Sequence, residues 1–106
     1  PLDLTQGESI GKLSVAIAER WGELDFLVLN AAMLGTLTPV ASIDAKEFSK
    51  VLTLNLLAPQ ALIATADPLL RKSDAGRVVA ITSSVGAKPR AYWGAYGASK
   101  AGLENL

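Results

Sequence analysis

The chain has 106 residues, half of them hydrophobic, and its ten basic side chains balance ten acidic ones. A neutral, half-apolar chain of this length is typical of one small globular domain and gives no reason to expect nucleic acid or an anionic membrane as a partner. It contains no cysteine and no histidine, which excludes disulfides, zinc sites built on those ligands and a Ser-His-Asp triad.

The first predicted element is a helix over residues 7–22. Its apolar positions recur every three or four residues, at Ile10, Leu13, Ile17 and Trp21. Gly22 is the expected residue just past its end. Residues 24–30 then form an apolar run that ends in a polar residue, which is typical of a strand buried on both faces of a parallel sheet. A loop is expected over residues 31–43.

A single long helix is predicted over residues 44–73. Asp44 and Glu47 have the spacing of a capping box, with Asp in place of the usual Ser or Thr. Pro68 should bend or tighten the final turns, because proline cannot donate a helical hydrogen bond.

The remaining chain predicts a second buried strand over residues 77–84, a loop over residues 85–94 and a helix over residues 95–106. Strands that alternate with helices indicate βαβ units and a parallel sheet. Because two strands alone make a poor sheet, we expect the chain to be a piece of a longer α/β protein.

The stretch ITSSVGAKPRAYWGAYGASK, residues 81–100, carries the polar groups of chemical interest. In a parallel α/β sheet ligands gather at the carboxyl ends of the strands, and Ser83 lies at the end of the second strand. Tyr96 and Lys100 are four residues apart and share one face of a helix. A cation about 4 Å from a phenolate contributes roughly 4 kcal/mol at an effective dielectric of 20, so a nearby ammonium favours proton transfer by a tyrosine.

This stretch resembles the active-site segment of the short-chain dehydrogenases/reductases, which have a Ser about thirteen residues before the Tyr of Y-x-x-x-K. Here the motif reads YGASK, and three further motifs follow the family's order: DLT at residues 3–5, LNAA at 29–32 and NLLAP at 55–59. The resemblance implies a Rossmann-like, doubly wound parallel sheet, of which residues 1–106 are the middle part of the NAD(P)-binding domain. The glycine-rich turn before it and the substrate lid after it are expected to lie outside this chain.

The resemblance also implies catalytic roles for four residues. Tyr96 would be the general acid/base, Lys100 would assist it and hold the nicotinamide ribose, and Ser83 would hydrogen-bond the substrate oxygen. Asn55 would anchor a water that relays protons to Lys100. Ser84 is a competing hydroxyl, but its spacing of twelve to Tyr96 fits the family less well.

The main-chain carbonyl of Asn55 has a separate physical feature. Pro59 lacks an N–H and cannot bond the carbonyl four residues before it, so we predict a bend near residues 55–59 and a carbonyl free for a relay water. A plain proline kink without function is the alternative.

Coenzyme binding, to NAD or NADP, would involve Tyr96 and Lys100 again together with four residues nearer the N-terminus: Asp3, Leu4, Asn30 and Ala31. The resemblance implies that Asp3 meets the adenine ring. The chain departs from the family's N-N-A-G motif at Leu29 and Ala32. Asn30 is still expected to tie the strand ends together, whereas Ala32 replaces the glycine that allows close backbone approach to the coenzyme.

The leading hypothesis is an NAD(P)-dependent oxidoreductase acting on a small-molecule alcohol or carbonyl compound, without a metal site. The alternatives are a nucleotide-sensing or scaffold protein that kept the fold, and a structural α/β domain with a coincidental motif. By analogy with the family we expect a homodimer or homotetramer. No apolar run approaches the roughly 20 residues that span a bilayer and no signal peptide is visible, so the expected location is cytoplasmic.

Overall fold

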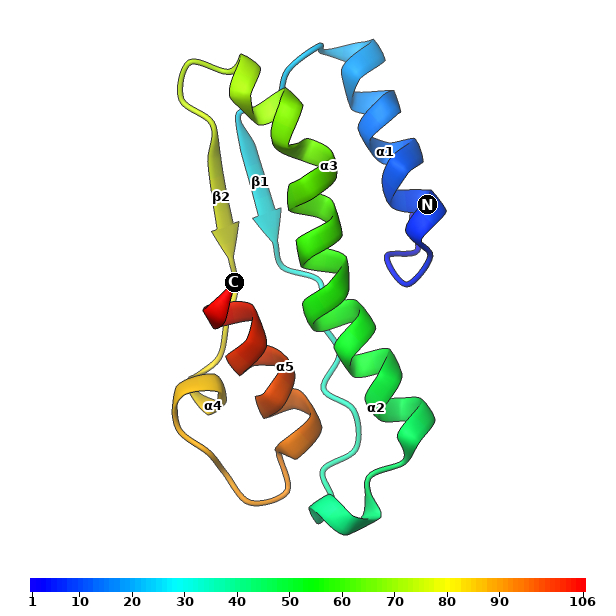
Figure 1. Ribbon diagram of the computed structural model, residues 1–106, viewed down its shortest axis with the longest axis vertical. Helices are drawn as coiled ribbons and strands as arrows, with labels where there is room; N and C mark the ends of the chain where they lie inside the picture. Colours follow the sequence, from blue (N-terminus) through cyan, green and yellow to red (C-terminus); the bar gives the residue numbers. More distant parts are fainter.

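The computed structural model describes residues 1–106, and Figure 1 shows two parallel strands with helices along one side and beyond their carboxyl ends. In chain order the elements are α1 (Gly7–Arg20), β1 (Phe26–Leu29), the 3-10 turn η1 (Val40–Ser42), α2 (Ala45–Leu52), the π-helical turn η2 (Thr53–Leu57), α3 (Ala58–Lys72), β2 (Arg77–Ala80), α4 (Ser84–Ala87) and α5 (Gly94–Asn105). None of these helices is both long and apolar enough to cross a membrane.

The two strands form a parallel sheet, as predicted, with Phe26 opposite Arg77 and Leu29 opposite Ala80. The backbone pairing extends one step further, because the Ile81 N–H donates to the Leu29 carbonyl oxygen at 3.0 Å. Both strands therefore end at the same edge, and the segments that follow them leave the sheet side by side.

Figure 1 shows β2, β1, α3 and α1 side by side, with α3 packed against both α1 and β1. The helices therefore lie on the β1 side of the sheet. Leu29 is buried against α3, whereas Phe26 and Val28, which alternate with it, are exposed on the other face.

The prediction that residues 24–30 form a strand buried on both faces is wrong for this chain, because Phe26 and Val28 of β1 are exposed. The prediction of a second buried strand is also wrong. All four residues of β2 are exposed, because the helices pack mainly against β1 and no further strand pairs with the free edge of β2. The apolar composition of the strand marks a surface that is suited to burial but is uncovered here.

The predicted long helix is present as α2, η2 and α3 in direct succession, so it is helical from Ala45 to Lys72 but not uniformly α-helical. Asp44 caps its first turn by accepting a hydrogen bond from the Glu47 N–H at 2.9 Å. The reciprocal half of the capping box is missing, because the Glu47 side chain accepts instead from the Thr36 hydroxyl.

The irregular part of this helix overlaps residues 55–59, where a bend beside Pro59 is predicted from the sequence. Within η2 the Ala58 N–H donates to the Thr53 carbonyl, five residues back, and Pro59 follows directly with no N–H to donate. π-type turns of this kind are rare and occur frequently at functional sites. The helix continues through Pro68 to Lys72, so this second proline does not end it.

Two local features refine the predicted boundaries. Gly22 follows α1 with a φ of 77°, a conformation that glycine adopts without steric cost, so its predicted place beyond the helix end is confirmed. The strand predicted over residues 77–84 ends earlier, at Ala80, and the predicted loop over residues 85–94 is wrong at its start, because Ser84–Ala87 form the short helix α4. The Ser83 side chain caps the N-terminus of this helix through a long hydrogen bond.

Candidate active site

The only three buried polar or charged side chains of the chain are Asn55, Ser99 and Lys100. They come from η2 and α5, which pack together beyond the carboxyl end of the sheet. Burial of polar groups is costly unless they are hydrogen-bonded, and none of them lacks a partner. This cluster therefore marks a built site at the edge where the sequence predicts chemistry.

Lys100 has only 3% of its surface exposed, and its ammonium donates a hydrogen bond to the Ile81 carbonyl oxygen at 2.9 Å. Burial lowers the pKa of Lys100 from its ordinary value, because removal from water disfavours the charged form. The bond fixes α5 to the segment that leaves β2, two residues before Ser83.

Tyr96 lies one helical turn before Lys100, and the Lys100 Nζ atom is 5.6 Å from the centroid of the Tyr96 ring. The phenol and the ammonium therefore share one face of α5, as the Y-x-x-x-K spacing predicts. The Tyr96 ring also meets Trp93 edge-on, with ring centroids 5.9 Å apart. The tyrosine ring thus has both a cation and an indole as neighbours.

Ser83 is half-buried and forms the N-cap of α4, where its Oγ accepts a long hydrogen bond of 3.4 Å from the Val85 N–H. Its proton is not used in this bond, so the hydroxyl can still donate to a substrate oxygen. Ser84 begins the same helix, is exposed and makes no side-chain hydrogen bond. That the Ser83 and Tyr96 hydroxyls face one reacting oxygen stays a prediction.

Asn55 is 1% exposed, and its side-chain amide holds the loop after β1 by two backbone bonds. Its Oδ1 accepts from the Met33 N–H and its Nδ2 donates to the Met33 carbonyl oxygen, both at 2.9 Å. Since these bonds occupy the side chain, a relay water would have to use the Asn55 main-chain carbonyl. Pro59 deprives that carbonyl of the usual helical donor.

The residues expected to bind the coenzyme gather at the end of β1. Leu4, Asn30 and Ala31 line a cavity of about 50 Å³, together with Pro59 from the start of α3. This volume is well below the roughly 300 Å³ of a small ligand pocket, so these residues form one wall of a coenzyme site at most. Asn30 is exposed and its side chain makes no hydrogen bond, so it does not tie the strand ends together here.

Asp3 is exposed and directly precedes Leu4, which lines this cavity. Its carboxylate accepts hydrogen bonds from the Thr5 hydroxyl at 2.7 Å and the Thr5 N–H at 2.9 Å. The side-chain bond from Thr5, with the backbone bond added, lowers the pKa of Asp3 below its ordinary value. The carboxylate is thereby kept ionised and oriented.

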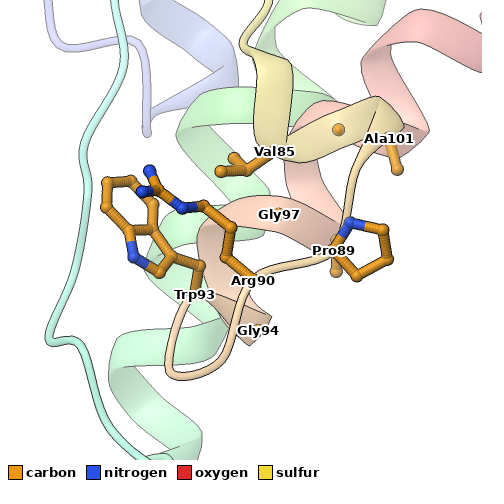
Figure 2. Close-up of a pocket in the computed structure, with 9 residues that line it drawn as sticks. Val85, Pro89, Arg90, Trp93, Gly94, Gly97 and Ala101 are labelled. Atoms are coloured by element: carbon orange, nitrogen blue, oxygen red, sulfur yellow. The ribbon is translucent and has the colours of Figure 1, made fainter.

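A larger cavity of about 240 Å³ lies between α4, α5 and the loop that joins them (Figure 2). Its α5 residues recur at helical spacing on one side of the helix: Gly94, Gly97, Ala98 and Ala101. Tyr96 and Lys100 lie elsewhere on the surface of α5 and do not line this cavity. Figure 2 shows the Arg90 guanidinium stacked beside the Trp93 ring, 5.3 Å from its centroid.

The loop aromatics before α5 have separate roles. Trp93 is half-buried, packs on Tyr96 and lines the larger cavity. Tyr92 is 59% exposed and has a φ of 71°, which is unusual for a residue with a side chain. Its carbonyl oxygen accepts from the Thr38 N–H at 3.1 Å, which ties this loop to the one after β1.

The sequence interpretation missed two participants, Ser99 and the Ile81 carbonyl. Ser99 is fully buried, accepts from the Asn55 amide at 3.0 Å and donates to the Tyr96 carbonyl oxygen at 2.7 Å. A signal for it was present, because a small polar residue stands beside Lys100 within YGASK. No side-chain signal marks Ile81, since only its backbone takes part.

Comparison with known proteins agrees with this geometry. The family model for short chain dehydrogenases matches residues 1–106. The uncharacterized oxidoreductase YciK of Escherichia coli K12 is 38% identical over 99 residues, which cover 93% of this chain and 39% of that protein. The chain thus spans well under half the length of this relative.

Solved structures show the same fold. A short chain dehydrogenase from Escherichia coli CFT073 complexed with NADPH superposes with a TM-score of 0.93 at 40% identity, covering 98% of this chain and 44% of that one. A xylitol dehydrogenase bound to NAD⁺ gives a TM-score of 0.92 at 28% identity, covering 99% of this chain and 40% of that one. The predicted α/β fold with a parallel sheet is confirmed as part of this larger architecture. The chain belongs to the short-chain dehydrogenase family.

Proposed function

We propose that the protein is an NAD(P)-dependent oxidoreductase that interconverts an alcohol and a carbonyl compound, and that residues 1–106 form part of its coenzyme-binding domain. The observation that carries this proposal is the buried Lys100 ammonium, fixed to the end of β2 and placed beside the Tyr96 ring. A buried cation near a tyrosine ring is the kind of arrangement that proton transfer by tyrosine needs.

In carbonyl reduction, Tyr96 would give its proton to the substrate oxygen, and in alcohol oxidation it would take that proton back. Ser83 has a free O–H with which to hold the same oxygen, since its Oγ serves α4 only as an acceptor. Bound NADH or NADPH would supply the hydride, and the oxidised coenzyme would accept it. The positive charge of Lys100 would stabilise the phenolate left on Tyr96.

The proton lost by Tyr96 must be replaced from solvent. The Asn55 main-chain carbonyl is suited to hold a water for this purpose, because Pro59 offers it no N–H and because the Asn55 side chain is committed elsewhere. The same site would bind the nicotinamide ribose through Lys100 and Tyr96. Asp3, Leu4, Asn30 and Ala31 would contact the rest of the coenzyme at the end of β1.

Coenzyme binding and turnover test the proposal in the full-length protein. Nicotinamide fluorescence with NADH and with NADPH should reveal binding and the preferred coenzyme, and a panel of carbonyl compounds and alcohols should reveal turnover. Tyr96→Phe should lower kcat by about 10² to 10⁴ while coenzyme binding persists.

Tyr92→Phe is the matched control, since the Tyr92 side chain is largely exposed and its hydroxyl makes no hydrogen bond. Full activity of Tyr96→Phe would refute the mechanism. Coenzyme binding without turnover on any alcohol or carbonyl compound would favour a non-catalytic nucleotide-binding role.

The homodimeric or homotetrameric state and the cytoplasmic location stay predictions. Light scattering on the full-length protein would measure the first, and imaging of a tagged protein in the cell would measure the second.

A further inference from the structure

Asn55 and Ser99 form a buried hydrogen-bonded pair that joins two distant segments of the chain. Both side chains are at most 1% exposed, and they meet at 3.0 Å between Nδ2 and Oγ. Asn55 extends the link to the backbone of Met33, and Ser99 extends it to the backbone carbonyl of Tyr96. A continuous line of hydrogen bonds therefore connects the loop after β1 with the first turn of α5.

The direction of every bond in this line is determined. Both Nδ2 protons of Asn55 are used, one for the Met33 carbonyl and one for the Ser99 hydroxyl, while Oδ1 accepts from the Met33 N–H. A flipped amide would place two donors face to face at Met33. Because the Asn55 amide occupies an acceptor site of Ser99, the Ser99 proton goes to Tyr96.

The two ends of the line are the two parts that the proposed reaction must bring together. Met33 follows Asn30 and Ala31, which lie at the expected coenzyme site, and Tyr96 is the expected proton donor. Ser99 itself is fully buried and has no surface on which a substrate could rest.

We propose that Ser99 is a positioning residue which, through Asn55, fixes the Tyr96 turn of α5 against the loop that binds the coenzyme. This inference rests on the proposed function. The plain alternative is a helical serine that bonds back to the carbonyl three residues before it and fills space. That alternative needs no bond to Asn55, and it predicts no effect on the Met33 loop.

Two substitutions separate the alternatives. Ser99→Ala removes the hydroxyl and leaves one buried Asn55 N–H without an acceptor, which loosens the amide that holds Met33. Ser99→Cys keeps nearly the same volume but replaces the hydroxyl with a poor hydrogen-bonding group. Ser49→Ala on the exposed side of α2 is the matched control, because the Ser49 hydroxyl makes no hydrogen bond.

The full-length protein and these three variants would be compared at a temperature where circular dichroism shows all of them folded. We expect Ser99→Ala to lower kcat by about 10- to 100-fold with a much smaller change in KM, since small misplacements of reacting groups cost rate. Amide hydrogen exchange at Met33, read by mass spectrometry over residues 31–36 without coenzyme, should quicken at least about tenfold. Ser99→Cys should fall between the parent and Ser99→Ala.

Parent-like kcat and parent-like exchange at residues 31–36 in Ser99→Ala would overturn the proposal, and a lower melting temperature alone would assign Ser99 to packing. Should Ser99→Ala not fold, the same two readouts on Ser99→Cys decide the question. Tyr96→Phe in the same assay distinguishes failure of the proposed function from failure of the positioning role of Ser99. An active Tyr96→Phe refutes the proposed function, whereas an inactive Tyr96→Phe beside a fully active Ser99→Ala refutes only the positioning role.

Discussion

The Lys100 ammonium and the Ile81 carbonyl oxygen are joined at 2.9 Å, and this is the one hydrogen bond that the buried cation makes. No carboxylate neutralises it, because the single ion pair of the chain joins Arg71 to Asp67 on the surface of α3. The bond holds α5 to the end of β2 at the cost of an uncompensated buried charge. Such a cost is expected where a charge serves function more than stability.

Replacement of Lys100 by Met should therefore change how stability depends on pH. The pKa of Lys100 is lowered by burial, so between this lowered pKa and the ordinary value of 10.5 the unfolded state binds more protons than the folded state. In this window the free energy of unfolding of the parent rises with pH. Lys100→Met should lack that rise and should equal or exceed the parent at pH 7 by up to about 1 kcal/mol.

Chemical denaturation of the full-length protein at pH 7 and pH 10, without coenzyme, measures this difference. The other titrating groups are common to both proteins, so they cancel in the comparison. An identical pH dependence in parent and variant would contradict the prediction.

Ser83→Ala should lower kcat by about 10² to 10³, the loss typical of removing one donor to a developing oxyanion. Stability should change little, because the capping bond that is lost is long and serves a helix of four residues. Ser84→Ala, one residue along, should keep parental kcat since the Ser84 hydroxyl is unbonded and exposed. Equal losses in the two variants would reassign the substrate-binding hydroxyl.

Gly86 should be sensitive to a methyl group, whereas Gly97 should tolerate one. A Cβ at Gly86 would lie 3.1 Å from both the Ala101 nitrogen and the Lys100 carbonyl carbon, so α4 and α5 would have to separate. Gly86→Ala should cost about 1 to 3 kcal/mol. A Cβ at Gly97 meets only the Val85 carbonyl oxygen at 3.4 Å, an ordinary contact, and Gly97→Ala should be neutral or stabilise α5 by up to about 1 kcal/mol.

Urea denaturation of the two alanine variants would rank them. Equal free energies of unfolding would show that α4 can shift without destabilising the protein. The close approach of α4 to α5 would then contribute nothing measurable to stability.

Asp44→Ala should lower the free energy of unfolding by about 1 kcal/mol, because it removes the acceptor for the Glu47 N–H at the start of α2. Asp74→Ala removes a carboxylate of equal charge that makes no hydrogen bond, and it should leave stability within about 0.5 kcal/mol. An equal change in the free energy of unfolding in both variants would show that the effect comes from net charge and not from capping.

The sequence predicts regular structure well where one pattern dominates. The apolar spacing from Ile10 to Trp21 gave α1, because burial against a single partner layer leaves a clear period. The run before Asn30 gave the position of β1 but not its burial, since Phe26 and Val28 are exposed. The same rule misjudged β2, whose apolar side chains have no covering layer in this chain. Periodicity shows that a strand is suited to burial and does not show what buries it.

The site was predictable as far as it depends on side chains that carry chemistry. That Tyr96 and Lys100 share one face of α5 follows from helical spacing, and Ser83 was expected at the end of the second strand. Ser99 was missed because a small hydroxyl in a helix is usually unremarkable until its neighbours are known. The π turn at Thr53–Leu57 was anticipated only as a bend beside Pro59, since a proline shows which donor is lost but not how the backbone rearranges.

The bare face of the sheet also determines how this polypeptide would behave in isolation. Phe26 and Val28 on β1, with Val79 on β2, present adjacent apolar side chains to water on this face, and the free strand edges offer unpaired amides beside them. Residues 1–106 expressed by themselves should therefore aggregate through these edges at micromolar concentration. Solubility, in this protein, is a property conferred on the strands by whatever packs over them.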